Sequence, residues 1–315
     1  MSAELATPPR SVPLPRLEHM RHRTVEAAGT RFHVAEMGSG PPVVLLHGWP
    51  QHWHAWRGVA PLLARDRHVI CPDLRGFGWS DAPDGAYAKR TFAQDTVAIL
   101  DALELESVDL VAHDWGAWAG FLLCLDHPDR VRHYVALNMY TPWPDGPSVR
   151  ALLSLTRLWY QVVLGAPGLG PLVVRRTDFA KRIITTAAVH DDVWSDADLD
   201  SYADVLREPA RARASSRLYR TFLLRELGPY LRGAHRDHRL TVPTLLLHGM
   251  RDLAVDHRLL GDWRRYADNM AVELRADSGH FIAEELPELV ASRAAALFDG
   301  EDPAAIVAAG GADDR

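Results

Sequence analysis

Short apolar segments alternate with helical patterns along most of this chain of 315 residues. Residues 43–47 (VVLLH) form one such segment and end in a turn. The others lie at residues 68–72, 108–113, 131–137 and 244–248, with a weaker candidate at 271–275. Continuous apolar segments separated by helices predict a parallel sheet that is covered on both faces. Ligands of such sheets bind beyond the carboxyl ends of the strands, so candidate functional residues should directly follow these segments.

The alternation stops between residues 141 and 234, where helical patterns continue without a convincing strand. This stretch begins with the Pro-rich TPWPDGP and predicts a helical lid inserted over the active edge of the sheet. Residues 20–140 and 235–300 then form the two parts of an α/β core. Residues 1–19 are rich in proline and polar groups and predict a disordered arm, and residues 301–315 predict a flexible tail.

Composition excludes several classes of partner. The formal net charge is −6 and no long basic stripe occurs, which argues against nucleic acid. No apolar segment reaches the roughly 18 residues that span a bilayer, so no membrane partner is expected. The absence of a secretory signal and the presence of only two cysteines, Cys71 and Cys124, favour a cytoplasmic location. The 16 histidines and 10 tryptophans leave a metal site, a redox centre or an aromatic pocket to be considered.

The sequence AHDWG at residues 112–116 lies between an apolar segment and a helical pattern. This context is typical of a nucleophile elbow, and the small residues Ala112 and Gly116 permit its tight turn. Asp114 stands where a serine hydrolase has its serine, which disfavours a carboxylesterase. A carboxylate at this place can attack carbon directly and form an ester with the substrate. Taken alone, Asp114 is equally well explained as an ordinary helix N-cap.

The sequence HGWP at residues 47–50 follows the first strong apolar segment. In a nucleophile-elbow fold this turn places the backbone N–H of Trp49 beside the nucleophile. Together with the N–H of Trp115 it predicts an oxyanion hole. The Trp49–Pro50 bond is a candidate cis peptide, since it lies in such a tight turn. An ordinary β-turn is the simpler alternative for this motif.

Two later residues complete a candidate triad. Asp252 follows the segment that ends at His248, and His280 lies in the Gly-containing loop DSGHF. The chain order Asp114, Asp252, His280 matches nucleophile, acid and base in this type of fold. The alternative place for the acid, at the end of the preceding strand, holds Asn138, which cannot ionise. Two further carboxylates are weaker candidates for the acid: Asp145 and Asp256.

These motifs resemble those of the epoxide hydrolase and haloalkane dehalogenase group of the α/β-hydrolase fold. The resemblance covers about residues 20–300 and includes HGWP, DLRGFGWSDAP at residues 73–83, HDWG and the late GH. It implies a mostly parallel eight-stranded sheet with helices on both faces and an inserted helical lid. It also implies a cofactor-independent reaction in two steps. Asp114 attacks the electrophilic carbon, and water activated by His280, which Asp252 orients, hydrolyses the ester.

The same resemblance implies two lid tyrosines whose hydroxyls polarise an epoxide oxygen. One lies in a Tyr-Gln segment followed by Pro-Gly, which here is Tyr160-Gln161 before Pro167-Gly168, and the other is Tyr219 in a Tyr-Arg motif. An epoxide oxygen leaves as an alkoxide and therefore benefits from an acid. Each tyrosine, taken alone, can also be a packing residue of a lid helix.

A haloalkane dehalogenase with the same triad is the main alternative. A halide needs only N–H donors, and the indole N–H of Trp115 is a candidate, although similar epoxide hydrolases share this tryptophan. Similar enzymes that defluorinate small acids have arginines directly after the nucleophile and four residues after it. Here those places hold Trp115 and Trp118, so a carboxylate substrate lacks its partner. The aromatic, uncharged surroundings favour a neutral, fairly apolar epoxide.

Several side chains near these motifs are expected to shape the substrate pocket: His113, Trp118, Trp143, Trp159, Gln161 and Phe281. A metal centre is disfavoured, because the pairs His52–His54 and His235–His238 lack a carboxylate–histidine ligand set. A non-catalytic binding protein of the same fold is a further alternative, but it would not need a complete triad. The particular epoxide, its chirality and the oligomeric state stay open.

Overall fold

The computed structural model describes residues 12–85, 87–146 and 159–313. Eight strands form one sheet in the order β1-β2-β4-β3-β5-β6-β7-β8. Their bounds are β1 Arg21–Ala27, β2 Thr30–Met37, β3 Pro42–Leu46, β4 His68–Pro72, β5 Val108–His113, β6 Val131–Leu137, β7 Thr244–Gly249 and β8 Met270–Arg275. All neighbours from β4 to β8 are parallel, whereas β2 is antiparallel to both β1 and β4. The predicted mostly parallel, eight-stranded sheet is therefore confirmed.

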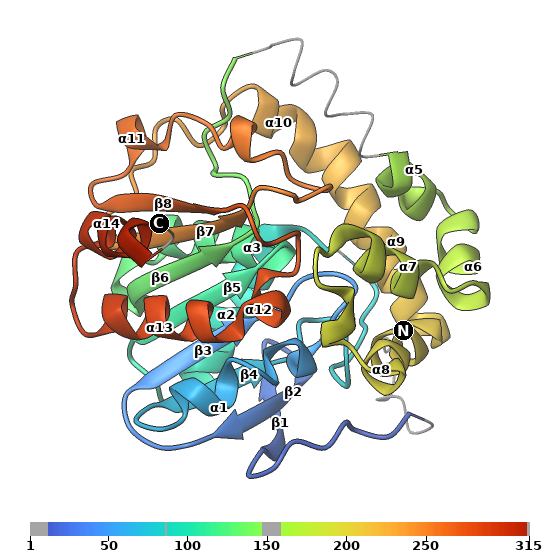
Figure 1. The fold of residues 1–315 in the computed structure, drawn as a ribbon. Helices are drawn as coiled ribbons and strands as arrows, with labels where there is room; N and C mark the ends of the chain where they lie inside the picture. Colours follow the sequence, from blue (N-terminus) through green and yellow to red (C-terminus); the bar gives the residue numbers. More distant parts are fainter. Residues whose placement is uncertain (1–11, 86, 147–158, 314–315) are drawn as a thin grey trace.

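Side chains of the central strands alternate between two apolar layers, one on each face of the sheet. In β3, Val44 and Leu46 belong to one layer, whereas Val43 and Leu45 belong to the other. Because both faces are buried, the parallel strands are largely apolar, which explains the apolar segments in the sequence. The first face is covered by α2 (Lys89–Ala102) and α3 (Trp115–Asp126). The second face, nearer the viewer in Figure 1, is covered by α1 (Ala60–Leu63), α12 (Ile282–Glu285), α13 (Pro287–Phe298) and α14 (Pro303–Asp313).

A group of helices between β6 and β7 forms a lid to one side of the sheet (Figure 1). Within residues 138–146 and 159–243, no strand joins the sheet. The lid helix α9 lies at the centre of this group and contacts α5, α6 and α8. The elements are α5 (Trp159–Gly165), α6 (Leu169–Arg176), α7 (Phe179–Ala187), α8 (Asp196–Arg207), α9 (Pro209–Thr221), the π-helical turn η5 (Phe222–Glu226) and α10 (Leu227–Leu231).

Both ends of the chain differ from the sequence-based expectation where the structure describes them. Residues 303–313, expected to form a flexible tail, are helical, and Ile306 of this helix is buried in the layer of α13. In the expected disordered arm, Leu14 and Leu17 pack against the same layer, and the carbonyl of Val12 accepts a 3.1 Å hydrogen bond from Nε1 of Trp79. Local composition misses both features, because contacts with distant residues order these segments. Residues 1–11 and 314–315 lie outside the described residues.

Candidate active site

The turn after β5 holds Asp114 in an uncommon backbone conformation. Its φ is 50° and its ψ is −123°. A positive φ is unfavourable for a residue other than glycine, so the surrounding structure must maintain it. Asp114 occupies the N-cap position of α3, yet its side chain makes no capping hydrogen bond. The ordinary N-cap explanation therefore fails, because an N-cap side chain accepts from the backbone N–H of the second or third residue of its helix. The turn is also tight, since a Cβ at Gly116 would lie 2.5 Å from the carbonyl oxygen of His47.

The HGWP turn lies directly against the Asp114 carboxylate. The backbone N–H of Trp49 donates to Oδ2 of Asp114 at 2.9 Å, and the backbone N–H of Trp115 bonds the same carboxylate. Gly48 permits this approach, because a Cβ there would lie 2.4 Å from the Cβ of Asp114. The Trp49–Pro50 peptide is cis, as expected. Two backbone N–H groups thus converge on one carboxylate, which is the arrangement that an oxyanion hole requires.

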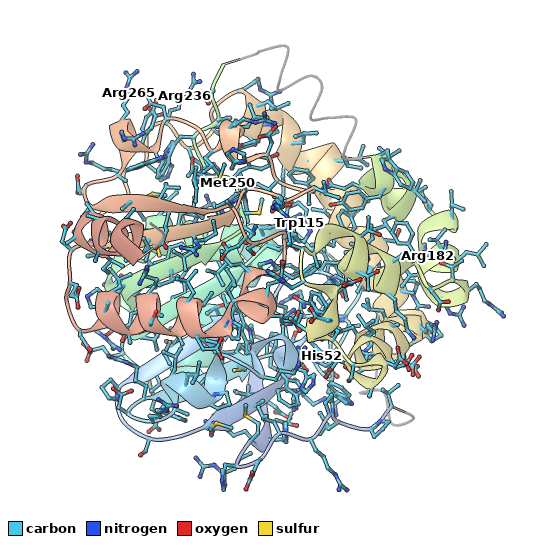
Figure 2. All side chains as sticks on the ribbon, viewed as in Figure 1. His52, Trp115, Arg182, Arg236, Met250 and Arg265 are labelled. Carbon is cyan, nitrogen blue, oxygen red and sulfur yellow. The ribbon has the colours of Figure 1, made fainter. Side chains whose placement is uncertain are left out.

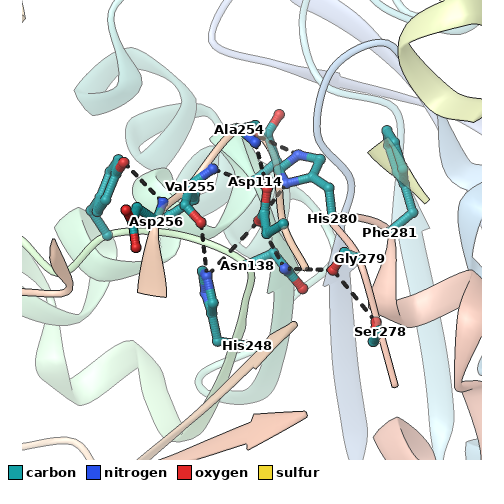
Figure 3. A network of polar contacts seen from close by, with 12 residues as sticks. Asp114, Asn138, His248, Ala254, Val255, Asp256, Ser278, Gly279, His280 and Phe281 are labelled. Carbon is teal, nitrogen blue, oxygen red and sulfur yellow. Dashed lines mark hydrogen bonds and ion pairs between the residues drawn. The ribbon is translucent and has the colours of Figure 1, made fainter. Parts of the chain in front are cut away.

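The loops after β7 and β8 bring His280 between two carboxylates. Nδ1 of His280 donates to Oδ2 of Asp252 at 2.8 Å, and its Nε2 lies 3.8 Å from Oδ1 of Asp114. The other oxygen of Asp252 accepts from the backbone N–H groups of Ala254 at 2.7 Å and Val255 at 2.9 Å. Figure 3 shows this network at the ends of the strands. The three side chains predicted as a triad are therefore adjacent in space.

The alternative acids occupy other places. Asn138 donates from Nδ2 to Asp252 at 2.9 Å and to the carbonyl of Gly279 at 3.0 Å, so it supports the acid instead of replacing it. Asp256 is bonded to a neighbouring arginine at 2.8 Å. Asp145 lines a separate cavity that Arg236 and Arg265 also line, and Figure 2 shows both arginines at the outer edge of the molecule. Among these candidates, Asp252 is the one that bonds His280.

Electrostatics in this network favour a protonated imidazole in the free protein. Burial opposes the charged form of His280, but the charge and hydrogen bond of Asp252, together with the charge of Asp114, raise the pKa of His280 to about 9. Burial alone would raise the pKa of Asp252, yet the charge and hydrogen bond of His280 lower it to about 2. For Asp114, burial raises the pKa against the opposing effects of His280 and the two backbone N–H groups. At neutral pH, an imidazolium therefore lies next to the ionised Asp252.

A cavity of about 350 Å³ lies between the strand ends and the lid. Tyr160 on α5 and Tyr219 on α9 both line it, and their ring centroids are 5.9 Å apart. Burial raises the pKa of each phenol, so both hydroxyls are protonated at neutral pH. The described residues that line the cavity are Trp49, Asp114, Trp159, Tyr160, Ile183, Thr186, Ala187, Tyr219, Leu253, Ala254 and His280.

Of the six side chains expected in the pocket, Trp159 lines the cavity and is 60% exposed at its mouth. Three others lie just behind the lining. Nε2 of His113 donates to the carbonyl of His280 at 2.7 Å, and the ring of Phe281 contacts the His280 ring with centroids 4.9 Å apart. Gln161 donates to the hydroxyl of Tyr160 at 3.4 Å. These three side chains support residues of the cavity and do not form its wall.

The expectation that Trp118 and Trp143 belong to the pocket is wrong. Trp118 lies one turn into α3 and packs edge-on against Tyr230 of α10, with ring centroids 4.9 Å apart. Trp143 is fully buried, stacks on Tyr266 and donates from Nε1 to the carbonyl of His235 at 2.8 Å. Trp118 therefore joins the core to α10 of the lid, and Trp143 joins segments on either side of the lid helices. Their aromatic character alone did not distinguish this packing role from a place in the cavity.

One wall of the cavity, which α7 forms, was not predicted from the sequence. Ile183, Thr186 and Ala187 line the cavity at positions i, i+3 and i+4, which is the spacing of one helix face. The carbonyl of Ala187 also accepts the backbone N–H of His280 at 2.8 Å, so this helix contacts His280 directly. Helical spacing was the available signal, but nothing local indicated which face of the helix would meet the sheet.

Other features of the described residues bear on the remaining alternatives. No group of three histidine, cysteine, aspartate or glutamate side chains in residues 12–85, 87–146 and 159–313 is arranged to hold a metal ion. His54, one of the paired histidines, bonds Asp198 of the lid at 2.8 Å. Cys71 and Cys124 are buried thiols. Within the same residues, no helix is long and apolar enough to cross a membrane.

Known proteins that are similar to this chain include epoxide hydrolases and a dehalogenase. The soluble epoxide hydrolase of Corynebacterium sp. (strain C12) is 31% identical over 288 residues, which cover 88% of this chain and 96% of that protein. A solved structure of an epoxide hydrolase from Vigna radiata superposes with a TM-score of 0.78 at 27% identity, covering 91% of this chain and all of that chain. A fluoroacetate dehalogenase from Burkholderia sp. is 32% identical over 212 residues, which cover 64% of this chain and 69% of that protein.

The match to a family model spans the core and the lid. The model is described as the alpha/beta hydrolase fold, and it matches residues 41–287. This range includes the elbow, the HGWP turn and the loop of His280. The chain therefore belongs to the α/β-hydrolase fold family.

Proposed function

We propose that this chain is an epoxide hydrolase that adds water to a neutral, fairly apolar epoxide and releases a vicinal diol. The main support is the convergence on one cavity of a buried carboxylate, an Asp–His pair and two protonated tyrosines. The names of the relatives support epoxide hydrolysis as the reaction class. Apart from Asp114 and His280, the described lining of the cavity is uncharged, which favours a neutral substrate.

In the first step, a carboxylate oxygen of Asp114 attacks one ring carbon of the epoxide. The carbon–oxygen bond of the ring breaks, and the leaving oxygen takes a proton from Tyr160 or Tyr219. The product is a hydroxyalkyl ester of Asp114. Both tyrosines suit the role of acid, because burial keeps their hydroxyls protonated and both line the cavity with Asp114.

Before the second step, His280 gives up its proton and the tyrosinate regains one. In the second step, the neutral His280 accepts a proton from water, and the hydroxide attacks the carbonyl carbon of the ester. The bond between that carbon and the alkyl oxygen then breaks, the diol leaves with the proton that the new carboxylic acid gives up, and Asp114 returns to its carboxylate form. The N–H groups of Trp49 and Trp115, which bond the free carboxylate, are placed to stabilise the oxyanion that forms. Ester formation removes the negative charge that lies 3.8 Å from Nε2 of His280. This loss lowers the pKa of His280 and so releases Nε2 as a base when the second step needs it.

Isotope labelling under single turnover tests the covalent mechanism. Excess enzyme is mixed with styrene oxide in ¹⁸O-water, and the diol is analysed by mass spectrometry. The first diol should contain only unlabelled oxygen, because its new oxygen comes from Asp114 and the labelled oxygen enters the carboxylate. A labelled first diol would contradict nucleophilic attack by Asp114.

A haloalkane dehalogenase is the second candidate, because the fluoroacetate dehalogenase relative shares much of the chain. Indole N–H groups near the nucleophile are the candidate halide donors. Nε1 of Trp49 instead donates to Oγ of Ser215 at 3.1 Å, and the Trp115 ring packs against Tyr219 and Phe222 of the lid. These contacts leave the two indoles engaged with the lid and favour the epoxide. Steady bromide release from 1-bromobutane without turnover of styrene oxide would reverse this preference.

A further inference from the structure

Lys89 is a buried cation next to the proposed active site. It is one of only two lysines among the 35 lysine and arginine residues of the chain, and its side chain is fully buried. It begins α2 at the junction of the sheet core and the lid. Burying an ammonium is costly unless the charge is paired, so its surroundings need an explanation.

The partners of Lys89 come mainly from the lid. Nζ donates to Oε2 of Glu226 at 2.7 Å and to the carbonyl oxygen of Leu218 at 3.4 Å. The backbone N–H of Lys89 donates to Oε1 of the same glutamate at 2.9 Å. Glu226 therefore pairs the ammonium and also caps α2, whose N-cap residue, Ala88, makes no side-chain cap. Through these bonds, η5 is attached to the first turn of a core helix.

The ammonium also contacts two aromatic rings. Nζ lies 4.3 Å from the ring centroid of Trp115 and 5.0 Å from that of Phe222. A cation at this distance from a ring face is attracted to it, more strongly when both are desolvated. Trp115 directly follows Asp114 and lies at the junction between the sheet and the lid (Figure 2). The same ring contacts Tyr219 and Phe222, with centroid distances of 5.9 Å and 4.9 Å.

Lys89 contacts two neighbours of Tyr219. The carbonyl that Lys89 bonds belongs to Leu218, the residue before Tyr219, and the ring that Lys89 covers packs against the Tyr219 ring. The π-helical turn begins three residues after Tyr219, and such turns commonly occur at functional sites. Burial raises the pKa of Tyr219, so its hydroxyl stays protonated beside the Trp115 ring.

We propose that Lys89 is a positioning residue for Tyr219. It acts through Leu218 and Trp115 and holds the Tyr219 hydroxyl where it can protonate the leaving oxygen. This inference rests on the proposed function, in which Tyr219 is an acid of the first step. The simpler explanation is that the Lys89–Glu226 pair only attaches the lid to the core. The two explanations predict different effects of replacing Lys89 and Glu226 in a Tyr219→Phe variant, which already lacks this proposed acid.

The test is a double-mutant cycle in single-turnover kinetics with styrene oxide. Lys89→Met with Glu226→Gln removes both charges, while the glutamine amide oxygen can still cap α2 and no unpaired charge stays buried. We expect this change to slow ester formation about tenfold with Tyr219 present and less than about twofold in a Tyr219→Phe background. Ester hydrolysis, which does not use Tyr219, should keep its rate constant within about twofold.

Lys181→Met is the matched control. Lys181 is the other lysine of the chain and pairs with Asp200 on the lid surface, so its loss should leave both rate constants unchanged. An equal loss of ester formation in both Tyr219 backgrounds, or a parallel loss in ester hydrolysis, would show that the pair only attaches the lid. Full activity of the charge-free variant would also overturn the inference. A wild-type protein that turns over no epoxide would instead contradict the proposed function.

Discussion

The sheet edge and the lid hold their candidate reactive groups by different means. At the sheet edge, Asp114 and Asp252 lie on loops at strand ends, and backbone N–H groups bond each carboxylate. In the lid, Tyr160 and Tyr219 lie on helices and are surrounded mainly by aromatic rings. The hydrogen bonds to these two carboxylates come from backbone near the strand ends, whereas the positions of the tyrosines depend on how the lid packs on the core.

This difference divides the proposed reaction between the two regions. The proposed nucleophile, base and oxyanion hole belong to the sheet edge and would serve any electrophile that forms an ester. The proposed acids for an epoxide belong to the lid, so in this mechanism the lid selects the leaving group. Substitutions in each region should therefore change different rate constants, which the following predictions use.

The largest effect is expected at the nucleophile itself. Asp114→Ala should lower turnover of an accepted epoxide by about 10⁴-fold or more, because no ester can form. Intact-mass spectrometry should detect no alkyl adduct on this variant. Asp145→Ala is the control, since Asp145 lines a separate cavity and its loss should leave turnover unchanged. Substantial diol formation by Asp114→Ala would indicate direct attack by water.

Loss of His280 should affect a different reaction step from loss of Asp114. His280→Gln should slow ester hydrolysis by about 10²- to 10⁴-fold while ester formation continues. The alkyl-enzyme should then accumulate, and intact-mass spectrometry should show a mass increase of one epoxide. If the epoxide is consumed at the normal rate and no adduct appears, His280 does not act as the hydrolytic base.

Substitution of the two lid tyrosines should slow ester formation and not ester hydrolysis. Tyr160→Phe combined with Tyr219→Phe should slow ester formation by about 10²- to 10⁴-fold, because the alkoxide leaves without a proton donor. Hydrolysis of any ester that forms should be unchanged in stopped-flow measurements. Tyr230→Phe is the control, since this lid tyrosine packs on Trp118 outside the cavity. Full activity of the double variant would rule out the two tyrosines as acids.

The pH dependence should also differ between the two steps. In the free protein the pKa of His280 is raised to about 9. Ester formation neutralises Asp114, which lowers this pKa toward the usual range for histidine. Ester hydrolysis needs the neutral imidazole, so its rate constant should rise with pH through this lowered pKa and level off below about pH 9. A rate constant that falls over this range would contradict general-base catalysis.

The smallest effect is expected for the amide that supports the acid. Asn138→Ala removes the 2.9 Å hydrogen bond to Asp252 and should slow ester hydrolysis about 3- to 10-fold. Ester formation should change less, because the tyrosines and Asp114 are untouched. An equal effect on both steps would show that Asn138 maintains the whole sheet edge and not only the orientation of Asp252.

Much of the sheet edge could be predicted from local sequence. The parallel strands are largely apolar segments, and the loops that follow three of them hold Asp114, Asp252 and Trp49. Parallel topology brings all such strand ends to one edge, so their proximity follows from the pattern alone. The lid tyrosines needed the family resemblance, since their helical patterns also fit ordinary packing residues.

Tertiary structure decided which side chains surround the substrate and which hold the lid in place. Trp159 lines the cavity whereas Trp118 and Trp143 pack elsewhere, although all three were equally plausible pocket residues. Nothing local marks Lys89 as a buried cation, and nothing local orders the helix at residues 303–313 against the core. The apolar pattern of a strand depends on residues one or two positions apart. The sequence alone therefore determined the sheet and the chain order of the three triad residues. The packing of a helix face depends on residues far along the chain, and that is why only the folded structure revealed the cavity wall and its supports.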